Sequence, residues 1–240
     1  EAKEAAKRLN PASILWLTQW NAIDEFDWGL QEFPDAVHIA RLGNPPYNTV
    51  AVPRLYERGF RLFQLGNEPP IEYSGTPHEW NDMLRAWLYE NAIKFPESIW
   101  LYSPMPVGPQ FDAANRAYWE EAADIIARPN VQLAAHAYWQ IPEAMTSPTW
   151  GLHWQTVHEM YPRKHIYLTE VGNTNPAMPK GEKAREYLIY ATMMPAYVKA
   201  LCIWGLDMTS DWEKDAVNLT MEMAEILNSY ENPDTGGDTM

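Results

Sequence analysis

Residues 60–70 read FRLFQLGNEPP, a short apolar run that is followed at once by a glycine, Asn67 and Glu68. The run predicts a buried strand, and the polar residues mark the point where that strand ends. A helical stretch follows at 77–93, with a proline in its first turn, and a second apolar run comes at 99–102. A strand, a helix and another strand in this order form a βαβ unit, which belongs to a parallel sheet.

The same alternation extends in both directions along the chain. Short apolar runs predict seven strands, at 13–18, 37–42, 60–65, 99–102, 131–138, 165–169 and 201–206. Amphipathic stretches predict helices at 1–9, 49–58, 77–93, 112–127, 150–160, 181–199 and 213–229. The stretch with Asp24, Asp27 and Trp28 is expected to be a polar and aromatic loop.

This order of elements predicts an α/β fold of the TIM type, a (β/α)8 barrel. Seven strands are one too few for that barrel and the chain opens with a helix, so the first strand is expected to lie before residue 1. An open, doubly wound sheet is the structural alternative. Its usual glycine-rich phosphate loop after a strand is absent from the sequence.

Length and composition favour one domain. The chain has 240 residues, of which 46% are hydrophobic and 21% are charged, and this suits a single barrel with a large core. No linker of glycine and serine interrupts it. We therefore expect one catalytic barrel domain over 1–230, followed by a disordered tail at 231–240 that is rich in proline, glycine and aspartate.

Charge and aromatic content bear on the partners. The net charge is −14, which repels phosphate backbones and anionic lipid, so we predict no nucleic-acid and no membrane partner. The chain holds 12 Trp and 13 Tyr against 6 Phe. These side chains combine a flat apolar face with a polar group, which suits a carbohydrate substrate, although a large barrel core is an equally good use for them.

Polar side chains follow several of the predicted strands. Active sites of parallel barrels form where the strands end, so these side chains are expected to share one mouth. Glu68 ends one strand and Glu170 ends another, far away in the sequence. Glycoside hydrolysis needs such a pair, in which one carboxyl group protonates the leaving oxygen and the other attacks the sugar or activates water.

Other chemistries lack their motifs. The sequence contains no His-Glu-x-x-His pattern, and His153 and His158 are five residues apart, on different faces of a helix. No Gly-x-Ser-x-Gly motif is present. The one cysteine, Cys202, lies in an apolar run and is expected to be a small core residue. We predict no metal and no cofactor.

Four segments resemble a known family. Residues 65–69 (LGNEP) resemble the strand-4 Asn-Glu-Pro motif of glycoside hydrolase clan A, and 168–172 (LTEVG) resemble its strand-7 nucleophile segment. Residues 136–139 (HAYW) are similar to its strand-6 region, and 203–205 (IWG) to its strand-8 tryptophan. The resemblance is spread over 13–207. It implies that this chain is a retaining glycosidase built on a (β/α)8 barrel.

The resemblance implies a role for each matching position. Glu68 would be the general acid/base, and Glu170 the nucleophile that forms a glycosyl-enzyme. Asn67 would hydrogen-bond the 2-hydroxyl of the sugar. Tyr138 or His136 would hydrogen-bond and orient Glu170.

Two further positions carry more open expectations. Trp204 would be the platform beneath the sugar, or a plain core residue. Arg41 would face the mouth and help to keep Glu170 ionised, or pair with a surface carboxylate. The arginine of the clan lies on strand 2, and 12–19 contain none.

The sequence therefore predicts a retaining glycosidase that cleaves β-linked glycans, within the chain because the loops are short. The alternative is a non-catalytic glycan-binding barrel, which the absent strand and the absent strand-2 arginine favour. A barrel enzyme for phosphorylated sugars is disfavoured by the net charge and by the lack of a glycine-rich phosphate loop. Polysaccharide hydrolysis would usually place the protein outside the cell, but the sequence leaves localisation and oligomeric state open.

Overall fold

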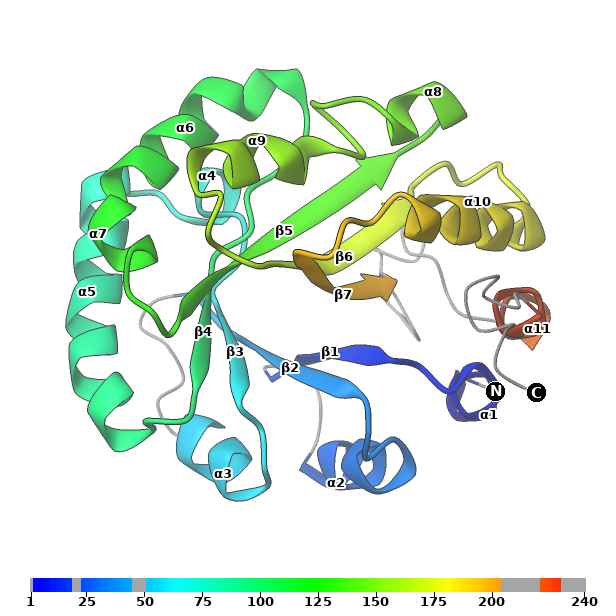
Figure 1. Cartoon of the computed structure of the whole chain (residues 1–240), viewed down its shortest axis with the longest axis horizontal. Helices are drawn as coiled ribbons and strands as arrows, with labels where there is room; N and C mark the ends of the chain where they lie inside the picture. The colour runs from blue at the N-terminus through cyan, green and yellow to red at the C-terminus, as the bar shows by residue number, and fades with distance from the viewer. Residues whose placement is uncertain (1, 19–22, 45–50, 204–220, 230–240) are drawn as a thin grey trace, which may run out of the picture.

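A computed structural model describes residues 2–18, 23–44, 51–203 and 221–229. Its seven strands are parallel and pair in chain order, so that they curl into a nearly closed barrel with the helices outside (Figure 1). The strands are β1 (Ser13–Leu17), β2 (Val37–Leu42), β3 (Leu62–Leu65), β4 (Ile99–Tyr102), β5 (Val131–Trp139), β6 (Ile166–Asn173) and β7 (Val198–Ile203). The prediction of a TIM-type α/β barrel is confirmed.

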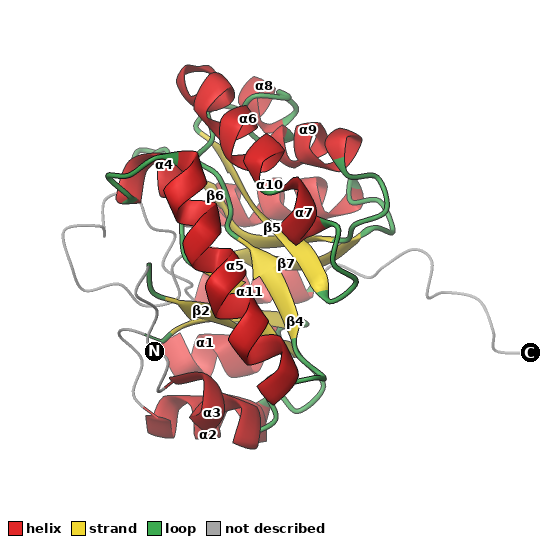
Figure 2. Cartoon of the chain, turned by 90° about the vertical axis from the view of Figure 1, so that its left-hand side faces the viewer, coloured by secondary structure: helices red, strands yellow, loops and turns green. Residues whose placement is uncertain are grey.

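Helices connect the strands and cover the outside of the barrel (Figure 2). They are α1 (Ala2–Leu9), α2 (Ile23–Glu32), α3 (Ala51–Glu57), α4 (Pro69–Glu72), α5 (Pro77–Lys94), the 3₁₀ turn η1 (Pro109–Phe111), α6 (Asp112–Glu121), α7 (Ala123–Ile126), α8 (Pro142–Met145), α9 (His153–Met160), α10 (Lys180–Thr192) and α11 (Met221–Asn228). None of the helices in these described ranges is both long and apolar enough to cross a bilayer.

The core has two layers, one on each face of the barrel wall. A large layer joins the outer face of the strands to the helices, and Trp80, Trp100 and Trp154 are completely buried in it. A smaller layer takes side chains from every strand and from no helix, among them Ile39, Leu101 and Tyr167. Because strand side chains alternate between the two faces, this second layer is the packed interior of the barrel.

The two edge strands close the barrel incompletely. The Ser13 hydroxyl on β1 donates to the Leu201 carbonyl on β7 over 2.9 Å, and no further strand lies between them among the residues described. Helices α1 and α11 pack against each other, and α11 also packs against α10 (Figure 1). This packing covers the outside of the seam.

Several sequence predictions differ from the structure. The strand predicted at 165–169 continues to Asn173, and the helix predicted at 112–127 is divided into α6 and α7. The stretch expected to be a loop forms α2, because Phe26 and Leu30 lie four residues apart on one face of the helix and pack inward. Helix α10 ends at Thr192 rather than at residue 199, because Pro195 cannot continue a helix, and β7 then begins at Val198. Of the last predicted helix, 213–229, residues 213–220 lie outside the described residues, and the remainder forms α11.

Candidate active site

The turn after β3 carries Asn67 and Glu68. Its backbone is left-handed at Gly66 (φ +70°) and again at Glu68 (φ 35°, ψ 59°). A Cβ at Gly66 would lie 2.6 Å from the Trp80 ring, so glycine is required there for space as well as for conformation. The Glu68 amide donates to the Pro104 carbonyl over 3.1 Å, and this fixes the turn against the segment after β4.

Strand β5 supplies His136 and Tyr138. Ala134 lines the barrel interior, and His136 and Tyr138 follow it by two and four residues. Because alternate side chains of a strand share a face, both point inward. The His136 side chain is completely buried. Arg41 on β2 faces inward for the same reason, since it lies two residues beyond Ile39.

Glu170 reaches the same interior through an irregularity in β6. Tyr167 faces inward, so regular alternation would turn Glu170 outward. The register with β5 shifts at this point: Leu168 pairs with Ala135, and Glu170 pairs with His136. One extra residue on β6 is therefore accommodated as a bulge, and the bulge turns Glu170 inward beside His136.

These side chains form one connected group, here called the mouth cluster: Arg41, Asn67, Glu68, His136, Tyr138 and Glu170. His136 bridges the two glutamates. Its Nδ1 lies 2.7 Å from Glu68 Oε1, and its Nε2 lies 3.8 Å from Glu170 Oε1. Nε2 is buried and has no hydrogen-bond partner among the described residues. One imidazole ring therefore separates the two carboxyl groups.

Glu170 has two further partners. The Tyr138 hydroxyl donates to Glu170 Oε2, and Arg41 Nη1 donates to Glu170 Oε1. The same Arg41 atom lies 3.2 Å from Asn67 Oδ1, to which it donates. Glu170 is 5% exposed and Glu68 is 17% exposed, so the first carboxyl group is held in the protein and the second is more open to solvent.

Burial and charge act on the titratable groups of the cluster. Burial lowers the pKa of His136, but the charge of Glu170 and the hydrogen bond to Glu68 outweigh it, so that the pKa is raised overall. Burial, followed by the charges of Glu170 and Glu68, raises the pKa of Tyr138 well above its ordinary value. Tyr138 therefore keeps its proton and remains a donor to Glu170.

The structure brings together six of the seven residues singled out in the sequence. It assigns the two candidate orienting residues to different carboxyl groups: Tyr138 contacts Glu170, and His136 forms its short contact with Glu68. Arg41 pairs with Glu170 rather than with a surface carboxylate. The seventh residue, Trp204, lies outside the described residues.

Three polar residues beside the cluster were not singled out in the sequence. Gln64 Nε2 donates to the Gly66 carbonyl over 2.9 Å and lies 3.5 Å from Asn67 Oδ1. Asn44 and Glu72 bind each other and Asn67. Asn44 follows β2 and precedes a proline, and Glu72 comes two residues after the pair Pro69-Pro70. In the sequence, both positions therefore resemble ordinary loop residues. Only their shared proximity to Asn67 distinguishes them.

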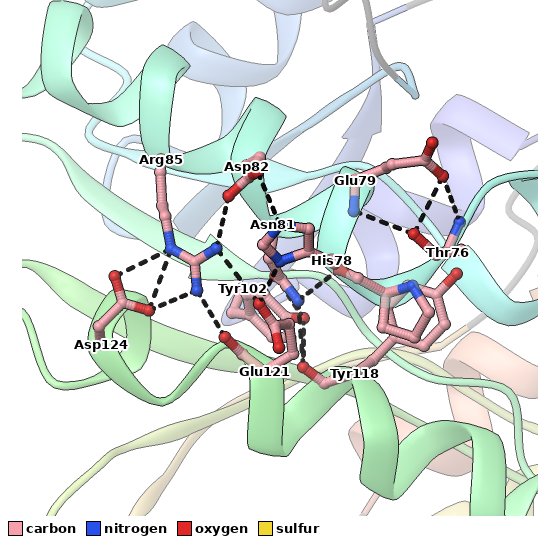
Figure 3. A network of polar contacts seen from close by, with 11 residues as sticks. Thr76, His78, Glu79, Asn81, Asp82, Arg85, Tyr102, Tyr118, Glu121 and Asp124 are labelled. Atoms are coloured by element: carbon pink, nitrogen blue, oxygen red, sulfur yellow. Dashed lines mark hydrogen bonds and ion pairs between the residues drawn. The ribbon is translucent and has the colours of Figure 1, made fainter.

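A second polar network lies on the outside of the barrel, between α5 and the α6–α7 segment (Figure 3). Arg85 donates to Asp82 over 2.8 Å, to Asp124 over 2.8 Å and to the Glu121 carbonyl over 2.7 Å. His78 lies 2.8 Å from Glu121 Oε1. We call these five residues the outer ion network. Within the described ranges, no group of three or more His, Cys, Asp or Glu is placed to hold a metal ion.

The fold and the mouth cluster define a class: a TIM-type barrel with one glutamate just after β3 and another in the second half of β6. Barrel enzymes carry their active sites at this end of the strands. A comparison with protein-family models gave no match, and a comparison with curated proteins gave none either. Solved structures do resemble the chain.

Three of these structures illustrate the likeness. A GH128 (subgroup II) endo-β-1,3-glucanase from Pseudomonas viridiflava has a TM-score of 0.67 at 17% identity, covering 96% of this chain and 95% of its own. A subgroup II endo-β-1,3-glucanase from Sorangium cellulosum has the same TM-score and coverage at 13% identity. A subgroup I endo-β-1,3-glucanase from Amycolatopsis mediterranei, in complex with laminaritriose, has a TM-score of 0.63 at 13% identity, with 93% and 92% covered. At these identities the likeness shows the barrel fold.

Proposed function

We propose that this protein is a retaining glycoside hydrolase that cleaves β-glycosidic bonds, with Glu68 as the acid/base and Glu170 as the nucleophile. The observation that carries the proposal is the mouth cluster, in which two inward-facing glutamates contact opposite nitrogens of one imidazole. Retaining hydrolysis requires two carboxyl groups close together on one site, with different environments. The difference in exposure and in partners between these two supports that division of roles.

The reaction would proceed in two steps, formation of a glycosyl-enzyme and its hydrolysis. Glu68, the more exposed group, transfers its proton to the glycosidic oxygen, while a Glu170 oxygen attacks the anomeric carbon and the leaving alcohol departs. Glu68, now a carboxylate, takes a proton from water, and the hydroxide oxygen displaces Glu170 with a second inversion. Tyr138 and Arg41 hold Glu170 in place through both steps, since each donates to one of its oxygens.

The remaining cluster residues would bind and position. Asn67 would hydrogen-bond the 2-hydroxyl of the sugar, a contact that strengthens in the transition state of glycoside hydrolysis. His136 would hold Glu68 toward the glycosidic oxygen through the 2.7 Å contact with Nδ1. Trp204, which lies outside the described residues, remains a proposal for the sugar platform.

β-1,3-Linked glucan is the substrate class we propose, with cleavage inside the chain. The support is that the GH128 barrels resembling this chain include endo-β-1,3-glucanases and that one of them holds laminaritriose in its crystal. Incubation with a soluble β-1,3-glucan and chromatography of the products test this. Early release of mixed oligosaccharides would support endo cleavage, whereas release of glucose alone would contradict it.

A mechanism-based label tests the assignment of the nucleophile. A 2-deoxy-2-fluoro β-laminaribioside with a good leaving group is expected to lose that group and to transfer its fluorinated disaccharide covalently to the protein. Peptide mapping should place the label on Glu170. The matched control is Glu186, another buried glutamate, which accepts from Trp139 and Asn173 outside the mouth cluster. Labelling elsewhere would contradict the role of Glu170. Binding of glucan without labelling or turnover would favour the non-catalytic barrel.

A further inference from the structure

Glu72 stands one helical turn beyond Glu68 and faces back toward the strand ends. It closes the short helix α4, and its amide donates to the Glu68 carbonyl over 2.9 Å. Each of its carboxylate oxygens has one amide partner: Asn67 Nδ2 donates to Oε1 over 2.5 Å, and Asn44 Nδ2 donates to Oε2 over 2.6 Å. Glu72 therefore ties together the loops that follow β2 and β3.

The partners of Asn67 determine which way its amide points. Its Oδ1 accepts from Arg41, and its Nδ2 donates to Glu72. If the amide were flipped, a donor would face the guanidinium and an acceptor would face the carboxylate, so both contacts would become repulsive. The Asn67 side chain has one oxygen and two N–H groups. The oxygen is bound to Arg41 and one N–H is bound to Glu72, so the second N–H is the group that can donate to a ligand.

Asn44 supports the same arrangement from the other side. Its Oδ1 accepts from the Asn67 backbone amide over 2.9 Å, while its Nδ2 binds Glu72. The Asn44 oxygen would lie 2.9 Å from a Cβ placed at Gly66. The approach of Asn44 is therefore available only because residue 66 has no side chain.

We propose that Glu72 is a positioning residue, which locks the Asn67 amide so that its remaining hydrogen is offered to the 2-hydroxyl of the sugar at the cleavage point. This inference rests on the proposed function and adds a residue to it. It makes Glu72 responsible for selecting substrates that can accept a hydrogen bond beside the reacting carbon. Glu72 would act through Asn67, without bonding to the reacting atoms.

The test compares two substrates in Glu72→Ala: an aryl β-laminaribioside and the analogue that lacks the 2-hydroxyl on the ring bearing the aryl group. On the first, kcat is expected to fall about 10- to 100-fold while KM changes little, because the contact strengthens only in the transition state. On the 2-deoxy analogue, kcat should match that of the wild type. Equal losses on both substrates would overturn the proposal, since general damage to the site does not depend on one hydroxyl.

Two further variants sharpen the test. Glu72→Gln keeps one oxygen to accept from Asn67 but turns a donor toward Asn44 Nδ2, so it is expected to recover part of the activity on the first substrate. Glu57→Ala removes an exposed glutamate from the end of α3, at the opposite ends of the strands, and should leave both substrates unaffected. If kcat of Glu72→Gln on the first substrate is no higher than that of Glu72→Ala, an oxygen that accepts from Asn67 is not what residue 72 contributes.

A measurement without turnover separates this inference from the proposed function. The side-chain amide resonance of Asn67 in the wild type should be shifted downfield by its hydrogen bond to a carboxylate, and Glu72→Ala should remove that shift. An unchanged resonance would overturn the positioning role. If the wild type hydrolyses neither substrate, the proposed function fails, and this resonance still decides whether Glu72 orients Asn67.

Discussion

The mouth cluster and the outer ion network are built from the same kinds of side chain, namely arginine, histidine and acidic groups. In the mouth cluster Arg41 and Glu170 are 10% and 5% exposed. In the outer ion network Arg85 and Asp124 are 27% and 55% exposed, and His78 is 69% exposed. Charged groups lie within hydrogen-bonding distance of one another in both regions, and the two regions differ in their access to water.

That difference changes what each contact does. Water and salt screen the charges of the outer ion network, so its ion pairs contribute little to stability. In the mouth cluster the charges have lost most of their hydration and depend on one another, so removal of one leaves another uncompensated. The same kinds of side chain thus form a weak link between helices in one region and, under the proposed function, the catalytic group in the other.

The largest expected difference between the regions is in activity. Glu170→Gln should lower kcat by about 10³-fold or more, because the amide is a far poorer nucleophile than the carboxylate. Glu121→Gln, the matched change in the outer ion network, should leave kcat and KM unaltered. Initial rates on a soluble β-1,3-glucan provide the measurement. If Glu170→Gln and the wild type have comparable rates, Glu170 is not the nucleophile and the mouth cluster is not the active site.

The next difference is in stability and is measured by urea unfolding. Arg41→Met should lower the free energy of unfolding by about 3–5 kcal/mol, because Glu170 is left buried without its cation. Arg85→Met should lower it by about 1 kcal/mol or less, since the partners of Arg85 remain hydrated. Similar losses in the two variants would mean that burial does not separate the regions.

The smallest difference concerns the two histidines. The hydrogen bond to Glu121, with the charge of Asp82, raises the pKa of His78, and His136 also has a raised pKa despite its burial. Each protonated imidazole therefore stabilises the folded state below the unfolded pKa of about 6.5, and this contribution disappears as the pH rises through the folded pKa.

Salt should distinguish these histidines in an NMR titration. Raising NaCl to about 0.5 M should move the pKa of His78 back toward its ordinary value, because its partners are exposed. The pKa of His136 should change little, since solvent ions do not reach it. Equal salt sensitivity would show that the mouth cluster is open to solvent.

Sequence reasoning predicted that Glu68, His136 and Glu170 share one mouth, and the structure does bring these side chains together. It ended the strand before Glu170, whereas β6 continues to Asn173. It rested on the order of elements, which apolar runs and helical spacing reveal directly. The inward turn of Glu170 could not be predicted, because it depends on a bulge in β6 that side-chain alternation does not show. Glu72 was missed because its role arises from a single turn of helix that brings it back to Asn67.

The left-handed backbone at Glu68 has a cost in stability. Apart from Asn10, Glu68 is the one described residue other than glycine with a positive φ, and such a conformation costs about 1–3 kcal/mol. Glycine at this position would relieve that strain but would remove the carboxyl group. Under the proposed function, the strain is the cost of placing the Glu68 carboxyl group beside His136.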